Sequence, residues 1–334
     1  MSNKKCVKEK YLYLSAMLRA REAKMLSRDK AERMLDAASF DEAAKILTDC
    51  GYEDMSGMSA GQIERVLIIR RDAIFTEIAR LSPDPETVDI FRIKYDYHNA
   101  KTLIKAEACE LDRADLLSAA GRVAPEALIT ALTEERFTGI PSKLAEAMLE
   151  AKSALARTSN PQLADFILDK AYFGELLGAA ERLGSPFMKD YAKILIDSAN
   201  LRSAVRTLRM KKDADFLKTA LVPGGGVDTG RVLAAADSGD ALAALYANGA
   251  LAFAAAKGAE AAAGGRMTEF ELACDNAVSA YLTRARLIAF GDAPVIAYLA
   301  AIEGETSAVR MILTGRLAGI APETIRERLR DYYA

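Results

Sequence analysis

The chain has 334 residues, of which 51% are hydrophobic and 28% are charged, a composition typical of globular rather than disordered proteins. Its 45 basic residues nearly balance 47 acidic ones, and the resulting net charge of −2 lacks the basic excess that is usual in nucleic-acid-binding proteins. The four cysteines have no zinc-type or disulfide-framework spacing, and there is one histidine, so we expect reduced thiols and no bound metal. The cysteines are Cys6, Cys50, Cys109 and Cys274.

The N-terminal region predicts neither a signal peptide nor a membrane anchor. The basic residues 1–10 are followed by a segment in which charged residues occur between Arg19 and Glu22. The most apolar stretch, residues 241–256, is rich in alanine, broken by Asn248 and too short to span a bilayer. We therefore expect that any role at a membrane is carried out from outside the bilayer.

Helix-forming residues dominate the whole chain, and apolar residues recur at helical spacing, for example between Val66 and Ile78. No alternating strand pattern of useful length occurs. Short segments with glycine or proline divide the chain into more than a dozen predicted short helices with no long linker. In chain order, these predicted turns are 83–85, 121–125, 139–141, 160–161, 184–186, 224–226, 291–294 and 319–322. The sequence therefore predicts an all-α fold.

A short motif recurs three times, with copies 101 and 108 residues apart. It consists of an acidic residue, two variable residues, an asparagine, one variable residue and a basic residue, followed by small or apolar residues. The copies are Asp96, Asn99 and Lys101, then Asp197, Asn200 and Arg202, and finally Glu305, Ala308 and Arg310. A proline precedes each copy at a similar distance, which indicates an internal repeat rather than chance similarity.

A second spacing supports the repeat, because a leucine, a residue five positions later and a leucine seven positions after that recur in the same order. The three sets are Leu35, Phe40 and Leu47, then Leu132, Phe137 and Leu144, then Leu233, Ser238 and Leu245. We interpret the chain as an N-terminal half-unit, residues 1–56, followed by three quasi-equivalent helical units, residues 57–158, 159–265 and 266–334. Three units are too few for an extended solenoid, so we predict one compact body with approximate threefold symmetry.

Two features resemble functional elements but lack the surroundings that the chemistry requires. His98 has no patterned catalytic partner, and we interpret it as structural. Residues 225–232 resemble a phosphate-binding loop, but Arg231 and Val232 stand where lysine and serine or threonine are required, and no strand precedes them. We therefore expect no catalytic residue, no cofactor and no direct nucleotide binding.

The repeated acidic residue and asparagine require a physical explanation. On a helix, Asp96, Asn99 and Leu103 project from one face, beside an apolar seam, whereas Lys101 points away from it. The hypothesis that we favour is that each unit buries a hydrogen-bonded acid–amide pair that fixes the packing of neighbouring helices. The alternative is that these side chains line a surface that meets a partner.

The segment from Phe91 to Leu103, FRIKYDYHNAKTL, resembles the signature of the C subunit of the bacterial and archaeal V-type and A-type ATPases, the counterpart of the d subunit in eukaryotic V-type ATPases. The resemblance extends over essentially the whole chain, including residues 20–26 near its start and residues 297–315 near its end. Ala308 departs from the pattern, because both the repeat and the family lead us to expect asparagine there.

The resemblance implies a funnel-shaped, all-helical protein with three similar lobes around a pseudo-threefold axis. It also implies a non-catalytic subunit of the central rotor stalk, on the cytoplasmic face of the membrane. Such a protein couples the stalk subunits D and F to the membrane ring of proteolipid subunits during proton or sodium transport, and when isolated it is expected to be a monomer. Two alternatives stay open: a helical-repeat scaffold for another protein partner, and a helical enzyme that uses scattered carboxylates.

Overall fold

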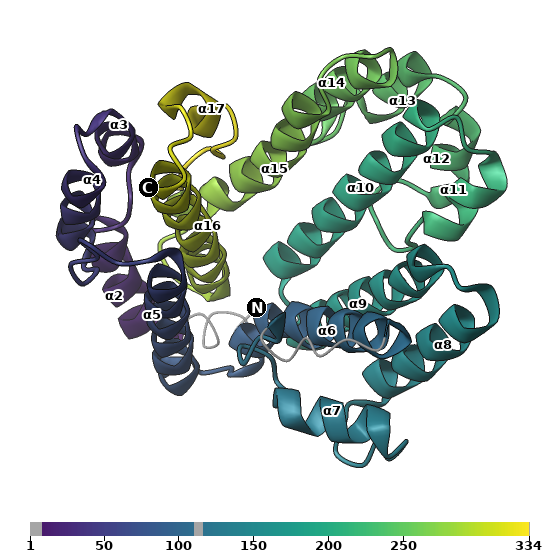
Figure 1. Cartoon of the computed structure of the whole chain (residues 1–334), viewed down its shortest axis with the longest axis horizontal. Coiled ribbons are helices and arrows are strands. Elements are labelled where there is room, and N and C mark those ends of the chain that lie inside the picture. The colour runs from purple at the N-terminus through teal and green to yellow at the C-terminus, as the bar shows by residue number, and fades with distance from the viewer. Residues whose placement is uncertain (1–8, 110–115, 334) are drawn as a thin grey trace. The chain divides into compact units, whose positions relative to one another are not determined.

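The computed structural model describes residues 9–109 and 116–333, and over these residues the chain is helical with no β-strand (Figure 1). The predicted all-α class is therefore confirmed. The helices are α2 (Leu12–Glu22), α3 (Arg28–Asp36), α4 (Phe40–Ile46), η1 (Leu47–Cys50), α5 (Ala60–Leu81), α6 (Glu86–Ala108), α7 (Pro125–Thr133), α8 (Ser142–Thr158), α9 (Pro161–Leu183), α10 (Pro186–Arg209), α11 (Ala214–Ala220), α12 (Thr229–Ala235), α13 (Gly239–Tyr246), α14 (Ala252–Ala262), α15 (Met267–Thr283), η3 (Arg284–Leu287), α16 (Asp292–Leu317) and α17 (Pro322–Arg326). Among the described residues, none of these helices is both long and apolar enough to cross a lipid bilayer.

The expectation of uniformly short helices is wrong for five of them. α5, α6, α9, α10 and α16 contain 22 to 26 residues each. The prolines of α9, α10 and α16 lie in the first turn, where a missing backbone N–H breaks no helical hydrogen bond. Proline therefore marks where these helices begin without shortening them.

The contacts within the chain divide it into two units. Residues 1–88 and 266–334 form one, called here the chain-end unit, and residues 89–265 form the other, called here the middle unit. Helix α6 passes from the chain-end unit into the middle unit. The finer division into three helical units and an N-terminal half-unit stays a prediction.

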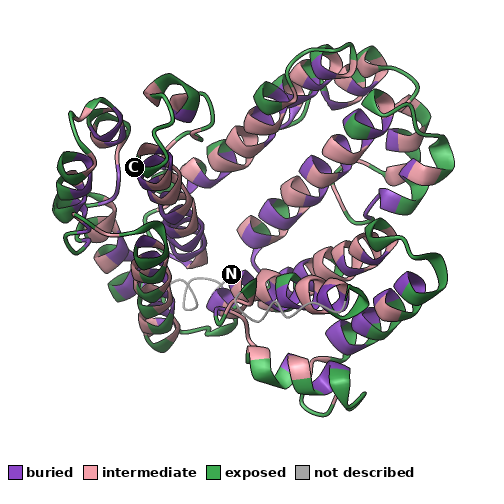
Figure 2. Cartoon of the chain, in the orientation of Figure 1, coloured by how far each residue is buried: buried purple, intermediate pink, exposed green. Residues whose placement is uncertain are grey.

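The core of the chain-end unit combines residues from both ends of the chain. One cluster of buried apolar side chains extends from Leu26 to Leu67 and is completed by residues of α16 and α17, among them Ile312 and Ile325. α16 is buried along much of its length, as Figure 2 shows by its buried and intermediate colours. Because fully burying one such side chain contributes about 1.5–3 kcal/mol, the N-terminal helices depend on α16 and α17 for their packing.

The middle unit is built largely from helices that are consecutive in sequence and pack against each other. α8 packs against α9, α9 against α10, and α13 against α14. In the last pair, a Cβ added to Gly239 would lie 2.8 Å from the Cα of Ala259, so the two helices approach too closely for a larger residue. Local packing of this kind explains why alanine-rich helices suit this part of the chain.

The leucines of the second spacing are buried in the first two sets and half-buried in the third. Leu35, Leu47, Leu132 and Leu144 are buried, whereas Leu233 and Leu245 are half-buried.

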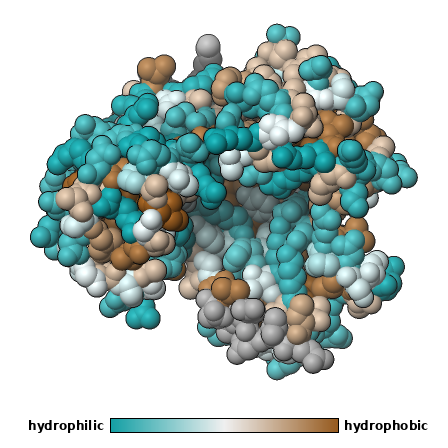
Figure 3. Space-filling model, turned by 45° about the horizontal axis from the view of Figure 1, so that its top comes forward, coloured by the Kyte–Doolittle hydropathy of each residue, from teal (hydrophilic) through white to brown (hydrophobic). Residues whose placement is uncertain are grey.

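On the face shown in Figure 3, hydrophilic side chains predominate and hydrophobic ones form small, separate patches. Single exposed apolar residues are ordinary on the surface of a folded protein.

Candidate functional site

The first copy of the repeated motif holds the loop that precedes α7. Asp96 and Asn99 lie on α6, and both are 0% exposed. The Asn99 amide donates to the carbonyl of Ser118 and accepts from its N–H, both at 2.8 Å. One Asp96 oxygen accepts the N–H groups of Arg122 at 2.8 Å and Val123 at 3.1 Å. We call this arrangement of a buried carboxylate and its loop donors a clasp.

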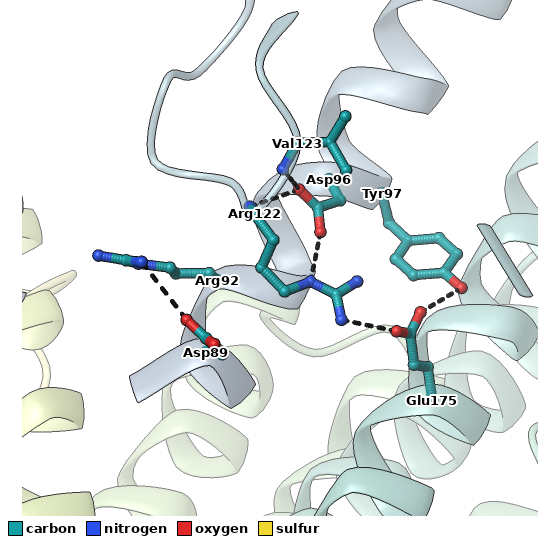
Figure 4. Close-up of polar contacts among 7 residues, drawn as sticks. All are labelled: Asp89, Arg92, Asp96, Tyr97, Arg122, Val123 and Glu175. Carbon is teal, nitrogen blue, oxygen red and sulfur yellow. Dashed lines mark hydrogen bonds and ion pairs between the residues drawn. The ribbon is translucent and has the colours of Figure 1, made fainter. Parts of the chain in front are cut away.

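A network of side chains extends the first clasp to a neighbouring helix (Figure 4). The Arg122 Nε donates to the second Asp96 oxygen at 2.7 Å, and its Nη1 donates to Glu175 on α9, also at 2.7 Å. The hydroxyl of Tyr97 donates to the other Glu175 oxygen at 2.9 Å. Arg122 thus joins α6, the loop and α9 through bonds to two carboxylates that are both largely buried.

The second copy of the motif forms an equivalent clasp around the loop before α12. The Asn200 amide bonds to both backbone groups of Val222 at 2.8 Å. The two oxygens of Asp197 accept the N–H groups of Gly226 at 2.9 Å and Val227 at 3.0 Å. Asn200 is 0% exposed and Asp197 is 9% exposed, so both act inside the protein.

The two loops agree in detail, which explains the spacing of the motif. The asparagine binds Ser118 in the first loop and Val222 in the second. In each loop, the carboxylate accepts the N–H groups of the residues four and five positions later. A glycine lies one position before the first of these donors in both cases. A Cβ at Gly121 would be 2.3 Å from Asp96 Oδ1, and a Cβ at Gly225 would be 2.2 Å from Asp197 Oδ1. Only glycine allows the carboxylate to approach the backbone this closely.

The third copy also buries its carboxylate, but its donors come from the other end of the chain. Glu305 on α16 is 5% exposed and accepts the N–H of Leu26 at 2.7 Å and the hydroxyl of Tyr52 at 2.7 Å. Leu26 lies two residues before the first residue of α3, just as Val123 and Val227 lie two residues before α7 and α12. The N-terminal segment therefore supplies the loop that the third motif holds.

Arg70 on α5 contacts two groups of the third clasp, the ring of Tyr52 and the carboxylate of Glu305. Its guanidinium lies 3.9 Å from the centre of the Tyr52 ring and 3.8 Å from a Glu305 oxygen. It also donates to the carbonyls of Gly51 at 2.7 Å and Cys50 at 3.0 Å. The positive charge thus partly compensates the buried carboxylate and fixes the turn after η1.

The basic residues of the motif lie outside the clasps. Lys101 pairs with Asp169 on α9 at 2.5 Å, and Arg310 pairs with Glu64 on α5 through bonds of 2.5 and 2.8 Å. Arg202 is half-buried on α10. In the two described pairs, the motif base joins its helix to another long helix of the same unit.

Burial dominates the electrostatics of the three acidic residues. It raises the pKa of Asp96, Asp197 and Glu305 above the ordinary value, and the hydrogen bonds to each carboxylate act in the opposite direction. Burial likewise raises the pKa of the Tyr52 hydroxyl beside Glu305. Because their oxygens are already engaged by backbone or side-chain donors, these carboxylates are suited to holding structure rather than to proton transfer with a substrate.

In the glycine-rich segment that resembles a phosphate-binding loop, the backbone N–H groups bind a side chain of the same protein. Gly226 and Val227 direct their N–H groups at the Asp197 carboxylate, which takes the place that an anion would occupy. His98 is exposed on α6, with its Nε2 3.2 Å from the carbonyl oxygen of Leu116. Within residues 9–109 and 116–333, no three side chains of histidine, cysteine, aspartate or glutamate gather as a metal site would require.

Several residues of the clasps carry no signal in the sequence. Arg122, Glu175 and Tyr52 contribute side chains, and their distance along the chain from the motif hides their role. Gly121 and Gly225 are predicted from the sequence only as parts of turns. Each precedes a valine by two positions and the next helix by four, and this shared Gly-x-Val pattern is the signal that could have aligned the two loops.

Comparison with known proteins places the chain in a family. A model of the ATP synthase (C/AC39) subunit family matches residues 14–328. The C subunit of the V-type sodium ATPase of Enterococcus hirae is 24% identical, over 97% of this chain and 99% of the relative. The C subunit of the A-type ATP synthase of Methanocaldococcus jannaschii is 25% identical over 96% of this chain and 86% of its own length, and that of the V-type ATP synthase of Thermus thermophilus is 25% identical over 62% and 67%. Because the family match covers nearly the whole sequence, this chain belongs to the ATP synthase (C/AC39) subunit family.

Proposed function

We propose that this protein is a non-catalytic subunit of the central rotor stalk of a V-type or A-type ATPase. In this role it binds the stalk subunits D and F on one side and the membrane ring of proteolipid subunits on the other, at the cytoplasmic face of the membrane. The family match over residues 14–328 carries this proposal. Relatives named as the C subunits of a V-type sodium ATPase and of an A-type ATP synthase support it.

The chemistry of the clasps agrees with a mechanical role. Each of the three buried carboxylates is bound by backbone donors of a loop that leads into a helix. Buried hydrogen bonds of this kind fix the position of loops relative to helices, and close-packed interiors transmit strain. A protein that passes torque between stalk and ring requires this stiffness and requires no bound nucleotide or nucleic acid.

The experiment that tests the proposal is calorimetric titration of the folded protein with the purified D–F pair from the same organism. Saturable one-to-one binding is expected, whereas titration with ATP and magnesium should give no binding heat. A second titration uses the proteolipid ring in detergent. Failure to bind either the D–F pair or the ring, with all components folded, would contradict the rotor role.

A further inference from the structure

We propose that residues 26–58, called here the strap, open as one segment while the rest of the chain-end unit stays folded, and that Glu305 is the latch that holds the strap closed. The strap contains α3, α4 and η1 and ends just before the N-cap of α5. This inference concerns a conformational device within the chain and does not depend on the proposed rotor function.

The first observation is that the third clasp is closed across the longest stretch of sequence. The loops held by Asp96 and Asp197 follow their carboxylates by 26 to 30 residues. By contrast, Leu26 lies 279 residues from Glu305. When the strap opens while α2 and α5 stay packed against α16, both of its ends remain fixed, so the strap can open without separating the two ends of the chain.

The second observation is that the third clasp has fewer backbone bonds. Asp96 binds two backbone N–H groups, and Asn99 adds a donor and an acceptor bond to Ser118. Glu305 binds the single backbone N–H of Leu26, and Ala308 stands where the amide would be. The Tyr52 hydroxyl donates a second hydrogen bond to Glu305, and Tyr52 lies within the strap.

Arginines outside the strap also make polar contacts with it. Arg316 donates to the carbonyls of Leu35 and Ala37 at the end of α3, both at 2.6 Å. Arg326 pairs with Glu32 and Asp36, and its side chain is 38% exposed. Exposed ion pairs contribute little to stability, so the polar links between the strap and α16 are chiefly the buried bonds of Glu305 and the half-buried bonds of Arg316.

Two buried cysteines make the opening measurable within one molecule. Cys50 lies in the strap and is 2% exposed, while Cys274 lies on α15 of the same unit, outside the strap, and is 0% exposed. A variant with Cys6→Ser and Cys109→Ser keeps only these two thiols. Opening of the strap alone exposes Cys50, whereas unfolding of the whole unit exposes both.

The experiment measures the rate at which a maleimide labels each of the two thiols. The reagent concentration is kept low enough that labelling is slower than reclosing of the strap. Each rate is then divided by the rate for the same thiol in the denatured chain. Normalisation removes any difference in intrinsic reactivity between the two thiols once they are exposed. We expect Cys50 to be labelled at least about tenfold faster than Cys274, since local opening requires less free energy than global unfolding. Equal normalised rates would overturn the proposal that the strap opens separately.

The latch is tested with Tyr52→Phe, which removes the hydroxyl donor to Glu305 and keeps the ring beside Arg70. Labelling of Cys50 should accelerate roughly tenfold, as expected for loss of a hydrogen bond to a charged group, with Cys274 unchanged. The matched control is Asp197→Asn in the middle unit, which should leave the ratio of the two rates unchanged. An unchanged Cys50 rate in Tyr52→Phe, or an equal rise at both thiols, would overturn the latch.

Discussion

Asp96, Asp197 and Glu305 each place a carboxylate where water does not reach it, and an ionised group in such a place is stable only when donors replace the lost water. In all three cases at least one donor is a backbone N–H close to the start of a helix, a group that has no partner within the helix. One interaction therefore satisfies two groups that would each destabilise the fold if left unpaired.

Substitution of the clasp glycines tests the close approach of carboxylate and backbone. Gly121→Ala and Gly225→Ala each place a methyl group within 2.3 Å of a carboxylate oxygen, so the carboxylate must move away from its donors. We expect each substitution to lower the free energy of unfolding by about 2–3 kcal/mol, measured by urea denaturation.

The matched control is Gly174→Ala on α9. An added Cβ there meets no atom within 4 Å, and the residue lies inside a helix. Because alanine favours the helix by about 1 kcal/mol over glycine, this variant should be as stable as the parent or more stable. Equal losses at all three glycines would show that the clasp is not the cause.

The pKa of Glu305 gives a stability prediction with a definite sign. Because burial raises this pKa in the folded state above the ordinary 4.5, the folded protein binds more protons, and stability falls as the pH rises from 4.5 through the raised value. Glu305→Gln removes this contribution, although Arg70 and Lys30 still lie near position 305. Urea denaturation across this pH range should show the variant gaining stability relative to the parent as the pH rises, and a constant difference would contradict the prediction.

At the scale of whole elements, the turns are predictable because their chemistry is local. Segments 160–161 and 184–186 lie between helices, as predicted, because Asn160 and Ser185 cap the next helix and proline occupies its first position. Helix length is predicted less well, since glycine within α9 and α16 does not interrupt them. Packing against neighbouring helices outweighs the weak helix propensity of glycine.

The partners of the motif could not be read from the sequence. The spacing identifies Asp96 and Asn99 as residues of one helix face, but it does not show that both hold the loop before α7. The pairing of Glu305 with Leu26 joins residues at opposite ends of the chain, and no local pattern encodes such a contact. Sequence periodicity reports which face of a helix is buried, and it does not report against which segment.

Removal of two clasps at once tests their structural role. Asp96→Ala combined with Asp197→Ala leaves four backbone N–H groups of two loops without their acceptors. The melting temperature, followed by circular dichroism, should therefore fall by roughly 5–15 °C. Lys101→Ala is the control, because its pair with Asp169 is partly exposed and should contribute less than about 1 kcal/mol. Unchanged stability with weakened binding of a partner would instead favour an interface role for these residues.

At the scale of the whole molecule, the two units differ in how their residues are distributed along the sequence. The middle unit is a continuous stretch, residues 89–265, whereas the chain-end unit joins two stretches that are far apart in sequence. The core that includes Met34 and Leu47 is completed by Ile312, Leu313 and Ile325. A continuous unit can bury its apolar surface without the rest of the chain, and a discontinuous one cannot.

Two fragments test this difference. Residues 86–265, which begin at the start of α6, should be helical and unfold cooperatively when expressed alone. Residues 1–85 should show little helicity and no cooperative transition, because their apolar residues lack α16 and α17. Thermal denaturation followed by circular dichroism compares them, and cooperative unfolding of the N-terminal fragment alone would contradict the shared core.

The shared core also sets an order of events during synthesis on the ribosome. Leu67 is translated about 240 residues before Val309, the first residue of α16 in the same cluster. At about 5–20 residues per second, the apolar surface of the N-terminal helices stays without its partner for roughly 10–50 s. During this interval synthesis of the middle unit is completed. The nascent chain then carries a folded middle unit and N-terminal helices whose apolar surface is not yet buried. The newborn protein is therefore most exposed to chaperones, and to aggregation on crowded polysomes, at the end that was made first.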